Sequence, residues 1–250
     1  MDLTNFREAL DGADVVEGFL NAASPGVIGA FLPNQHYPSE RAYLEALARV
    51  LREEYEAINQ AGFVVQIDCP DLAMARHTQY KDLSDAEFIR HAELHVEVLN
   101  HALERVPAQA ARLHLCWGNY DGPHDFDIPL AKIMRVLHKV KPQVISFESA
   151  NPRHAHEWRV WEEIAPPEDK VLMPGVIDTT CNFIEHPEYV AERICRFADI
   201  VGRERVIAGT DCGFGTFAGF GPVDPDIVWL KLKSLVDGAA LASKRLWGRK

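Results

Sequence analysis

Four side chains with the chemistry of metal ligands stand at the ends of short apolar segments. His114 and Cys116 close one segment, Glu148 closes the next, and Cys212 follows a third. Side chains alternate in an extended chain, so His114 and Cys116 point to the same side. One imidazole, two thiols and a carboxyl group suit zinc, because sulfur ligands favour zinc over magnesium or calcium. The alternative is that the thiols are small core residues and the other two are ordinary interior polar groups.

The elements that must position these residues alternate along the whole chain. Short runs rich in β-branched residues predict strands at 18–23, 63–68, 112–116, 144–148, 171–177 and 206–210. Amphipathic stretches between and after them predict helices at 39–61, 84–105, 128–140, 156–164, 187–202 and 225–246. Ser39 and Asp224 are suited to cap helices, and Ser84 with Glu87 forms a capping box.

Strand and helix alternation implies parallel strands joined by right-handed crossovers. The prediction is an α/β fold of the (β/α)8 TIM-barrel type, incomplete, with about six β/α units, forming a single domain over residues 1–250. A doubly wound sheet is the rival topology. Its nucleotide fingerprint is missing, because Gly213, Gly215 and Gly219 have the wrong spacing and no helix opens directly on them.

Charge and composition exclude several classes of protein. The 250 residues include 26 Lys and Arg against 37 Asp and Glu, a net charge of −11, so nucleic acid and anionic membranes are poor partners. No apolar run reaches the length of about eighteen residues that a membrane span needs, and residues 1–13 lack the pattern of a signal peptide. The odd, widely spaced set of five cysteines does not indicate a disulfide framework. We therefore expect a cytoplasmic protein with reduced cysteines.

Four separated motifs resemble one known family. Residues 114–118 (HLCWG), 146–151 (SFESAN), 174–178 (PGVID) and 209–213 (GTDCG) are similar, in order and placement, to signatures of the cobalamin-independent methionine synthase family. The match is to its catalytic zinc barrel, in a branch of compact single-barrel proteins. The resemblance implies that the metal is Zn2+ and that its ligands are His114, Cys116, Glu148 and Cys212.

The same resemblance implies a zinc-dependent methyltransferase of methionine biosynthesis. The substrates would be a small thiol such as homocysteine and a methyl or alkyl donor, which could be a folate. Two thiolates and a carboxylate over-neutralise Zn2+, so its bound water stays basic and a zinc hydrolase is the weaker alternative. An incoming thiol can instead displace Glu148, lose its proton and remain nucleophilic enough to attack a methyl group.

Further site residues follow from the match. Asp68, at a strand end, corresponds to the aspartate that holds the amino group of the thiol substrate; capping of the next turn is its alternative role. Asp178 and Thr180 fall at the catalytic segment that carries the family's proton donor. Trp117 and Asn119 lie in a Gly-containing loop after the first ligand segment and are expected to contact substrate.

Three departures limit what the resemblance implies. Members of the family have two further β/α units ahead of the region that matches this chain. Thr180 stands where the family has its proton-donating histidine, and a hydroxyl group is a poor general acid near neutral pH. The folate-contacting carboxylate is replaced by an apolar position near Met74. The chain is therefore expected to be a fragment, an open partial barrel, or a barrel completed by a companion chain or a homo-oligomer. A partner-dependent zinc-binding subunit without activity remains an alternative.

Other histidines are given lesser roles. His91 and His95 lie one helical turn apart and could bind a metal, but they are expected on the polar side of their helix. His154 and His156 follow the Glu148 strand and are expected mainly as polar residues at a helix start. His124 belongs to the same loop as Trp117, which we interpret as a lid.

Overall fold

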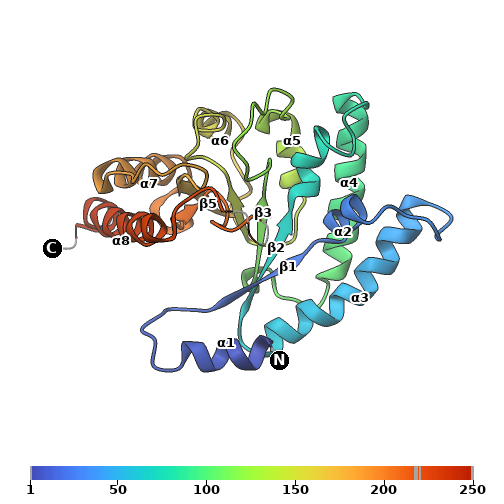
Figure 1. Cartoon of the computed structure of the whole chain (residues 1–250), viewed down its shortest axis with the longest axis horizontal. Helices are drawn as coiled ribbons and strands as arrows, with labels where there is room; N and C mark the ends of the chain where they lie inside the picture. Colours follow the sequence, from blue (N-terminus) through green and yellow to red (C-terminus); the bar gives the residue numbers. More distant parts are fainter. Residues whose placement is uncertain (1, 217–218, 220, 249–250) are drawn as a thin grey trace.

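The computed structural model describes residues 2–216, 219 and 221–248, and its centre is one sheet of parallel strands (Figure 1). Each strand pairs with the next along the chain, in the order β1 to β6. The strands are β1 (Phe19–Ala23), β2 (Val64–Cys69), β3 (Ala111–Leu115), β4 (Val144–Phe147), β5 (Val171–Ile177) and β6 (Gly209–Thr210). The sheet curls into a half-barrel, so the predicted incomplete (β/α) barrel is confirmed.

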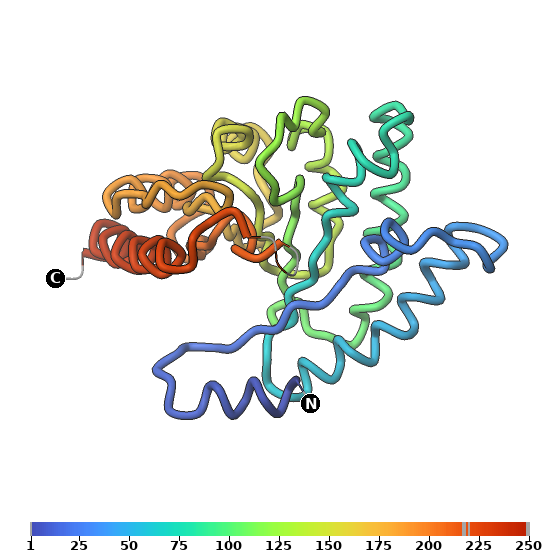
Figure 2. Tube along the Cα trace, in the orientation of Figure 1, coloured from blue at the N-terminus to red at the C-terminus, as the bar shows by residue number. Residues whose placement is uncertain are grey.

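Helices follow the strands and lie outside the curled sheet, as the path of the chain shows in Figure 2. They are α1 (Asp2–Leu10), α2 (Pro25–Phe31), α3 (Glu40–Gln60), α4 (Asp85–Ala102), α5 (Leu130–Leu137), α6 (Trp158–Glu163), α7 (Pro187–Val201) and α8 (Pro225–Trp247). Six of the eight occupy the predicted helical stretches, and α1 coincides with a further helical pattern in which Leu3, Phe6 and Leu10 share one face, whereas α2 was not predicted. Among the described residues, none of the helices has the length and apolar character of a membrane span.

The helix ends are set by local side-chain chemistry. Ser39 Oγ accepts a hydrogen bond from Ala42 N at 3.2 Å at the start of α3. Ser84 and Glu87 form the predicted capping box of α4, and Asp224 accepts a hydrogen bond from Asp226 N at the start of α8. Each cap satisfies an amide at a helix N-terminus that has no partner within the helix.

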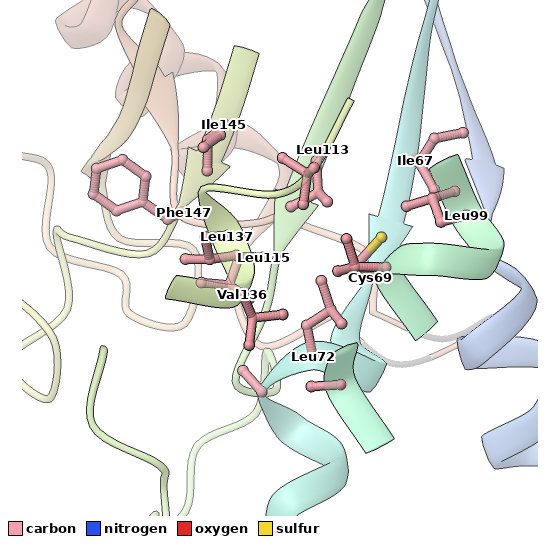
Figure 3. Close-up of a cluster of buried hydrophobic side chains, with 14 of the residues drawn as sticks. Ile67, Cys69, Leu72, Leu99, Leu113, Leu115, Val136, Leu137, Ile145 and Phe147 are labelled. Atoms are coloured by element: carbon pink, nitrogen blue, oxygen red, sulfur yellow. The ribbon is translucent and has the colours of Figure 1, made fainter. Parts of the chain in front are cut away.

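The outer face of the sheet packs against the helices. Figure 3 shows Leu113 and Leu115 of β3 among a cluster of buried apolar side chains that includes Leu137 of α5 and Phe147 of β4. Since side chains alternate along a strand, this packing turns His114 to the opposite face. The register aligns Asp68 with His114 and His114 with Ser146 on neighbouring strands.

The last two helices, α7 and α8, pack side by side over β5. Gly238 of α8 lies against Val190 of α7, where an added Cβ would come within 2.5 Å of the Val190 Cβ. Lys231 of α8 is fully buried, and its Nζ lies 2.9 Å from an oxygen of Glu185. A buried charge of this kind depends on its partner, because an isolated one is strongly disfavoured.

Candidate metal site at the carboxyl ends of the strands

Three of the four predicted ligands meet at the carboxyl ends of the strands. The ligand atoms of His114, Cys116 and Cys212 all lie within 4.8 Å of one another, and all three residues are buried. The two sulfurs are 3.6 Å apart. In a tetrahedral site with Zn–S bonds of about 2.3 Å, two sulfurs lie about 3.8 Å apart. The group therefore has ligand types and a sulfur separation that fit zinc.

Cys212 reaches this group because its neighbour Asp211 is anchored in the loop after β4. The buried Asp211 carboxylate accepts hydrogen bonds from the backbone N–H groups of Ser149, Ala150 and Asn151 at 2.7–2.8 Å, and from the Asn151 side chain at 2.8 Å. This role was not predicted, although Asp211 lies within the motif at 209–213. The residue in the sequence that accompanies this role is Gly175 on β5. Asp211 packs so closely against it that an added Cβ would lie 2.6 Å from Asp211 Cα.

Glu148 lies beside the three ligands but outside the group of atoms within 4.8 Å. Its Oε1 accepts a hydrogen bond from Trp117 N at 2.7 Å. Its Oε2 accepts from Asn151 Nδ2 at 2.8 Å and from Arg153 Nη2 at 2.9 Å. The carboxylate thus has three donors of its own, and its expected place as the fourth ligand stays a prediction.

Several acidic groups lie close together in this buried site, and their proximity shifts the pKa values of the ligands. A hydrogen bond from Cys212, together with His114, holds the pKa of Cys116 well below its usual range, and the same pairing raises the pKa of Cys212. Burial opposes ionisation of His114, but its hydrogen bond to Cys116 and the acidic neighbours outweigh this and raise its pKa to about 9. Burial, with Cys116 and Asp211 nearby, raises the pKa of Glu148 to about 8. A divalent cation would compensate this excess of acidic groups.

The other predicted site residues occupy the same rim. Asp68 is the penultimate residue of β2 and pairs with His114 of β3, and burial raises its pKa to about 6. Asp178 follows β5, and its Oδ1 accepts hydrogen bonds from both the N–H and the hydroxyl of Thr180 at 2.8 Å. Asp178 therefore orients the Thr180 hydroxyl group.

The first residues of the loop after β3 are packed, whereas Phe126 further along the loop is 73 % exposed, and the interpretation of the loop as a lid stays a prediction. The Trp117 side chain is fully buried, its Nε1 donates to Ile128 O at 2.8 Å, and its ring stacks on His154 at 4.2 Å. The Asn119 amide donates to Gly213 O and to the Thr216 hydroxyl group and accepts from Thr179, all at 2.7–2.8 Å. The observed contacts of both side chains are structural, and contact with a substrate remains untested.

His95 also differs from its prediction. It is 3 % exposed rather than on a polar surface, because it faces Asp71 across 2.9 Å. His91 remains partly exposed and pairs with Glu40 at 2.9 Å. Helical spacing alone placed His95 correctly relative to His91, but it could not show that the Asp71 carboxylate, 24 residues earlier, would make burial favourable.

The carboxyl rim of a parallel (β/α) barrel, where two cysteines and a histidine meet in this chain, is the place at which such barrels carry their functional residues. Residues 12–224 match the family model of the cobalamin-independent synthase, catalytic domain. The chain belongs to this family, as the sequence motifs predicted.

Relatives and a solved structure agree with this assignment. The methionine synthase of Thermococcus kodakarensis is 25 % identical, over 89 % of this chain and 56 % of its own length. The 2-hydroxypropyl-CoM lyase of Xanthobacter autotrophicus is 24 % identical, over 84 % of this chain and 57 % of its own. A B12-independent methionine synthase from Shewanella sp. W3-18-1, solved with selenomethionine, superposes with a TM-score of 0.70 at 20 % identity, covering 99 % of this chain and 67 % of that one. The chain thus spans little more than half the length of these curated relatives.

Proposed function

We propose that this chain transfers a methyl or related alkyl group to the sulfur of a small thiol such as homocysteine, at a zinc site. The observation that carries the proposal is the meeting of His114, Cys116 and Cys212 at the carboxyl rim of a barrel of this family. The names of the relatives, methionine synthase and 2-hydroxypropyl-CoM lyase, support sulfur-centred chemistry. They differ in the thiol and the donor, so we assign the substrate only as a class.

We assign a separate role to each polar side chain at the carboxyl rim. His114, Cys116 and Cys212 would hold the zinc ion, with Glu148 as its exchangeable fourth ligand. Zinc bound there lowers the pKa of a substrate thiol and keeps it as a reactive thiolate. In the structure the Glu148 carboxylate accepts hydrogen bonds from Trp117 N, Asn151 and Arg153. These bonds would hold the carboxylate when a substrate thiol replaces it as a ligand.

Two acidic residues would position the organic part of the substrate. Asp68 offers a carboxylate at the end of β2, next to the metal group, where it can accept hydrogen bonds from a substrate ammonium group. Asp178 holds the Thr180 hydroxyl group at the end of β5. Because a hydroxyl group is a weak acid, we propose that Thr180 orients the donor and that the leaving group does not take its proton from it.

Metal loading tests the site. Purified protein should bind Co2+ stoichiometrically with thiolate-type absorption, and adding homocysteine should change that spectrum. The Cys116→Ser/Cys212→Ser double variant should lose the thiolate bands, and each single variant should weaken them. Cys195→Ser in α7 is the matched control, since this cysteine lies outside the group, and it should bind like the wild type. Wild-type protein without stoichiometric metal would contradict the proposal.

Activity is tested separately by following methylated thiol formed from homocysteine, with methyl folate and simpler methyl compounds as donors. Metal binding without any spectral response to thiols would instead favour a zinc-binding subunit.

A second candidate role, dependence on a companion chain or a second copy, is favoured by the edge of β1. Phe19 on this strand is 40 % exposed, and Val16 just before it is fully exposed. Within the described part of the chain β1 pairs only with β2, and an unpaired edge can accept another strand. Sedimentation of the metal-loaded protein, with activity measured across the same concentrations, tests this role: activity that rises with assembly supports it.

A further inference from the structure

A second group of side chains that could hold a metal lies in the loops after β2 and β3, apart from the sulfur ligands. The ligand atoms of His77, His124 and Asp127 lie within 4.8 Å of one another. His77 Nδ1 is 2.9 Å from Asp127 Oδ1, and His124 Nδ1 is 3.0 Å from Asp127 Oδ2. Nitrogen and oxygen ligands at about 2.0–2.1 Å in a tetrahedral site lie about 3.3 Å apart. The spacing is therefore suited to one small cation.

Both imidazoles turn their Nδ1 atoms toward the Asp127 carboxylate, and the Nε2 of His77 lies 3.1 Å from the Tyr120 hydroxyl group. His124 Nε2 faces Tyr120 O at 3.2 Å, and a carbonyl oxygen can only accept, so this nitrogen carries the proton. In the neutral ring Nδ1 then presents a lone pair to the Asp127 carboxylate, which also only accepts. Among the described residues, His77 Nδ1 has no hydrogen-bond partner although it is buried beside the same carboxylate. A bound cation would satisfy both nitrogens.

Neighbouring groups hold the three side chains of this site in place, as the outer-sphere partners of metal ligands do. His154 Nε2 lies 3.3 Å from Asp127 Oδ2, and its Nδ1 lies 2.8 Å from Glu157, so a third imidazole orients the carboxylate. The hydrogen bond from His124 Nε2 to a backbone carbonyl is the arrangement that fixes the tautomer of metal-binding histidines. Such partners raise the basicity of the ligands and hold them in place.

The backbone is shaped to present His124. This residue has a φ of 51°, in the left-handed region that most side chains avoid. Its ring stacks on Tyr120 at 4.1 Å. Glycines on both sides of the tyrosine permit this, because a Cβ at Gly118 or Gly122 would lie 2.6–2.7 Å from the Tyr120 ring.

We propose that His77, His124 and Asp127 form a second binding site for a divalent transition metal, independent of the thiolate site. Two imidazoles and one carboxylate without sulfur suit Zn2+ or Fe2+ and leave coordination positions open for water or a ligand. The side chains of His77 and Asp127 keep 9 % exposure, which leaves the ion a way in. This site goes beyond the proposed methyl transfer, which uses none of its three residues.

Metal counting and cobalt spectroscopy on the full chain test this site. Wild-type protein should bind two equivalents of Zn2+. The Cys116→Ser/Cys212→Ser double variant should keep one, and with Co2+ it should show weak bands without thiolate absorption. His124→Ala and Asp127→Asn should each keep one equivalent, with thiolate absorption. The exposed His36→Ala is the matched control and should bind two.

Circular dichroism shows whether each variant is folded, and the Asp127→Asn change preserves the volume of the side chain in case His124→Ala does not fold. A wild-type protein that binds one equivalent, all of it lost in the double cysteine variant, would overturn the second site and leave the thiolate site standing. A wild-type protein that binds one equivalent without thiolate absorption, lost in His124→Ala and Asp127→Asn but kept in the double cysteine variant, would support the second site and contradict the first.

Discussion

The contact between Gly175 and Asp211 predicts a large effect of adding one methyl group. In Gly175→Ala the new Cβ would lie 2.6 Å from Asp211 Cα and 2.7 Å from Asp211 N, and closer still to Oδ1. Ordinary carbon contacts need about 3.5–4.0 Å, so Asp211 has to move by about 1 Å.

A shift of that size breaks the hydrogen bonds that Asp211 accepts at 2.7–2.8 Å from residues 149–151. Overpacking costs about 1–3 kcal/mol, and each buried polar group left without a partner costs about 1–3 kcal/mol. With partial relaxation we expect a loss of about 3–5 kcal/mol in the free energy of unfolding. Because Cys212 follows Asp211, we also expect zinc affinity to fall by about 10–100-fold, as when outer-sphere partners of a metal are lost.

Urea unfolding followed by circular dichroism measures the stability, and competition with a chromophoric chelator measures zinc affinity. Gly213→Ala is the matched control: it lies on the same rim, its Cβ would meet no atom within 4 Å, and its stability should stay within about 0.5 kcal/mol of wild type. If Gly175→Ala were as stable as Gly213→Ala and bound zinc equally well, the anchoring role of Asp211 would be refuted.

Three further predictions concern pH, a buried charge and the metal. Burial opposes protonation of His95, but Asp71 and a second neighbouring carboxylate raise its pKa to about 9, above about 6.5 when unfolded. The stabilisation from the protonated His95 is therefore complete below about pH 6.5 and lost as the pH rises through about 9. Urea unfolding should show that the wild type loses more stability over this range than His95→Gln. Equal losses would contradict the raised pKa of His95. Lys231→Met should cost about 3–5 kcal/mol by leaving the Glu185 carboxylate without its cation and with Asp178 N as its remaining donor, and adding Glu185→Leu should recover part of the unfolding midpoint; a double variant less stable than the single one would argue against this. Removing metal with a chelator should leave the circular dichroism spectrum intact while lowering the thermal midpoint, because Asp211 holds the rim without the ion; unfolding on chelation would be the opposite result.

Most of the architecture could be predicted because each strand and helix carries its own local pattern. The caps at Ser39 and Ser84 lie within the helix-start motifs that predicted them. Helix α2 was missed because Pro25–Phe31 is short and contains two glycines, which lower intrinsic helix propensity. The last strand, expected over 206–210, is reduced to Gly209–Thr210 with an isolated bridge at Val206.

The site was harder to predict where it depends on distant partners. Period-two alternation on β3 was enough to place His114 and Cys116 on one face. The partners of Glu148 come from loops, and no local pattern indicates that Trp117 N and Arg153 would bind its carboxylate. The His77 group was missed for the same reason, since Asp127 lies 50 residues further along the chain.

The ligands of the sulfur site are carried by two strands, β3 and β6, that differ in length and burial. β3 is buried along its whole length between two neighbours, whereas β6 has two residues and, among those described, pairs only with β5. Short edge elements open at a lower free energy than central ones, so amide hydrogens around Cys212 should exchange with solvent well before those of β3. Local opening of that edge would then give a bound ion an exit, in which the Cys212 sulfur moves away while His114 and Cys116 stay in place.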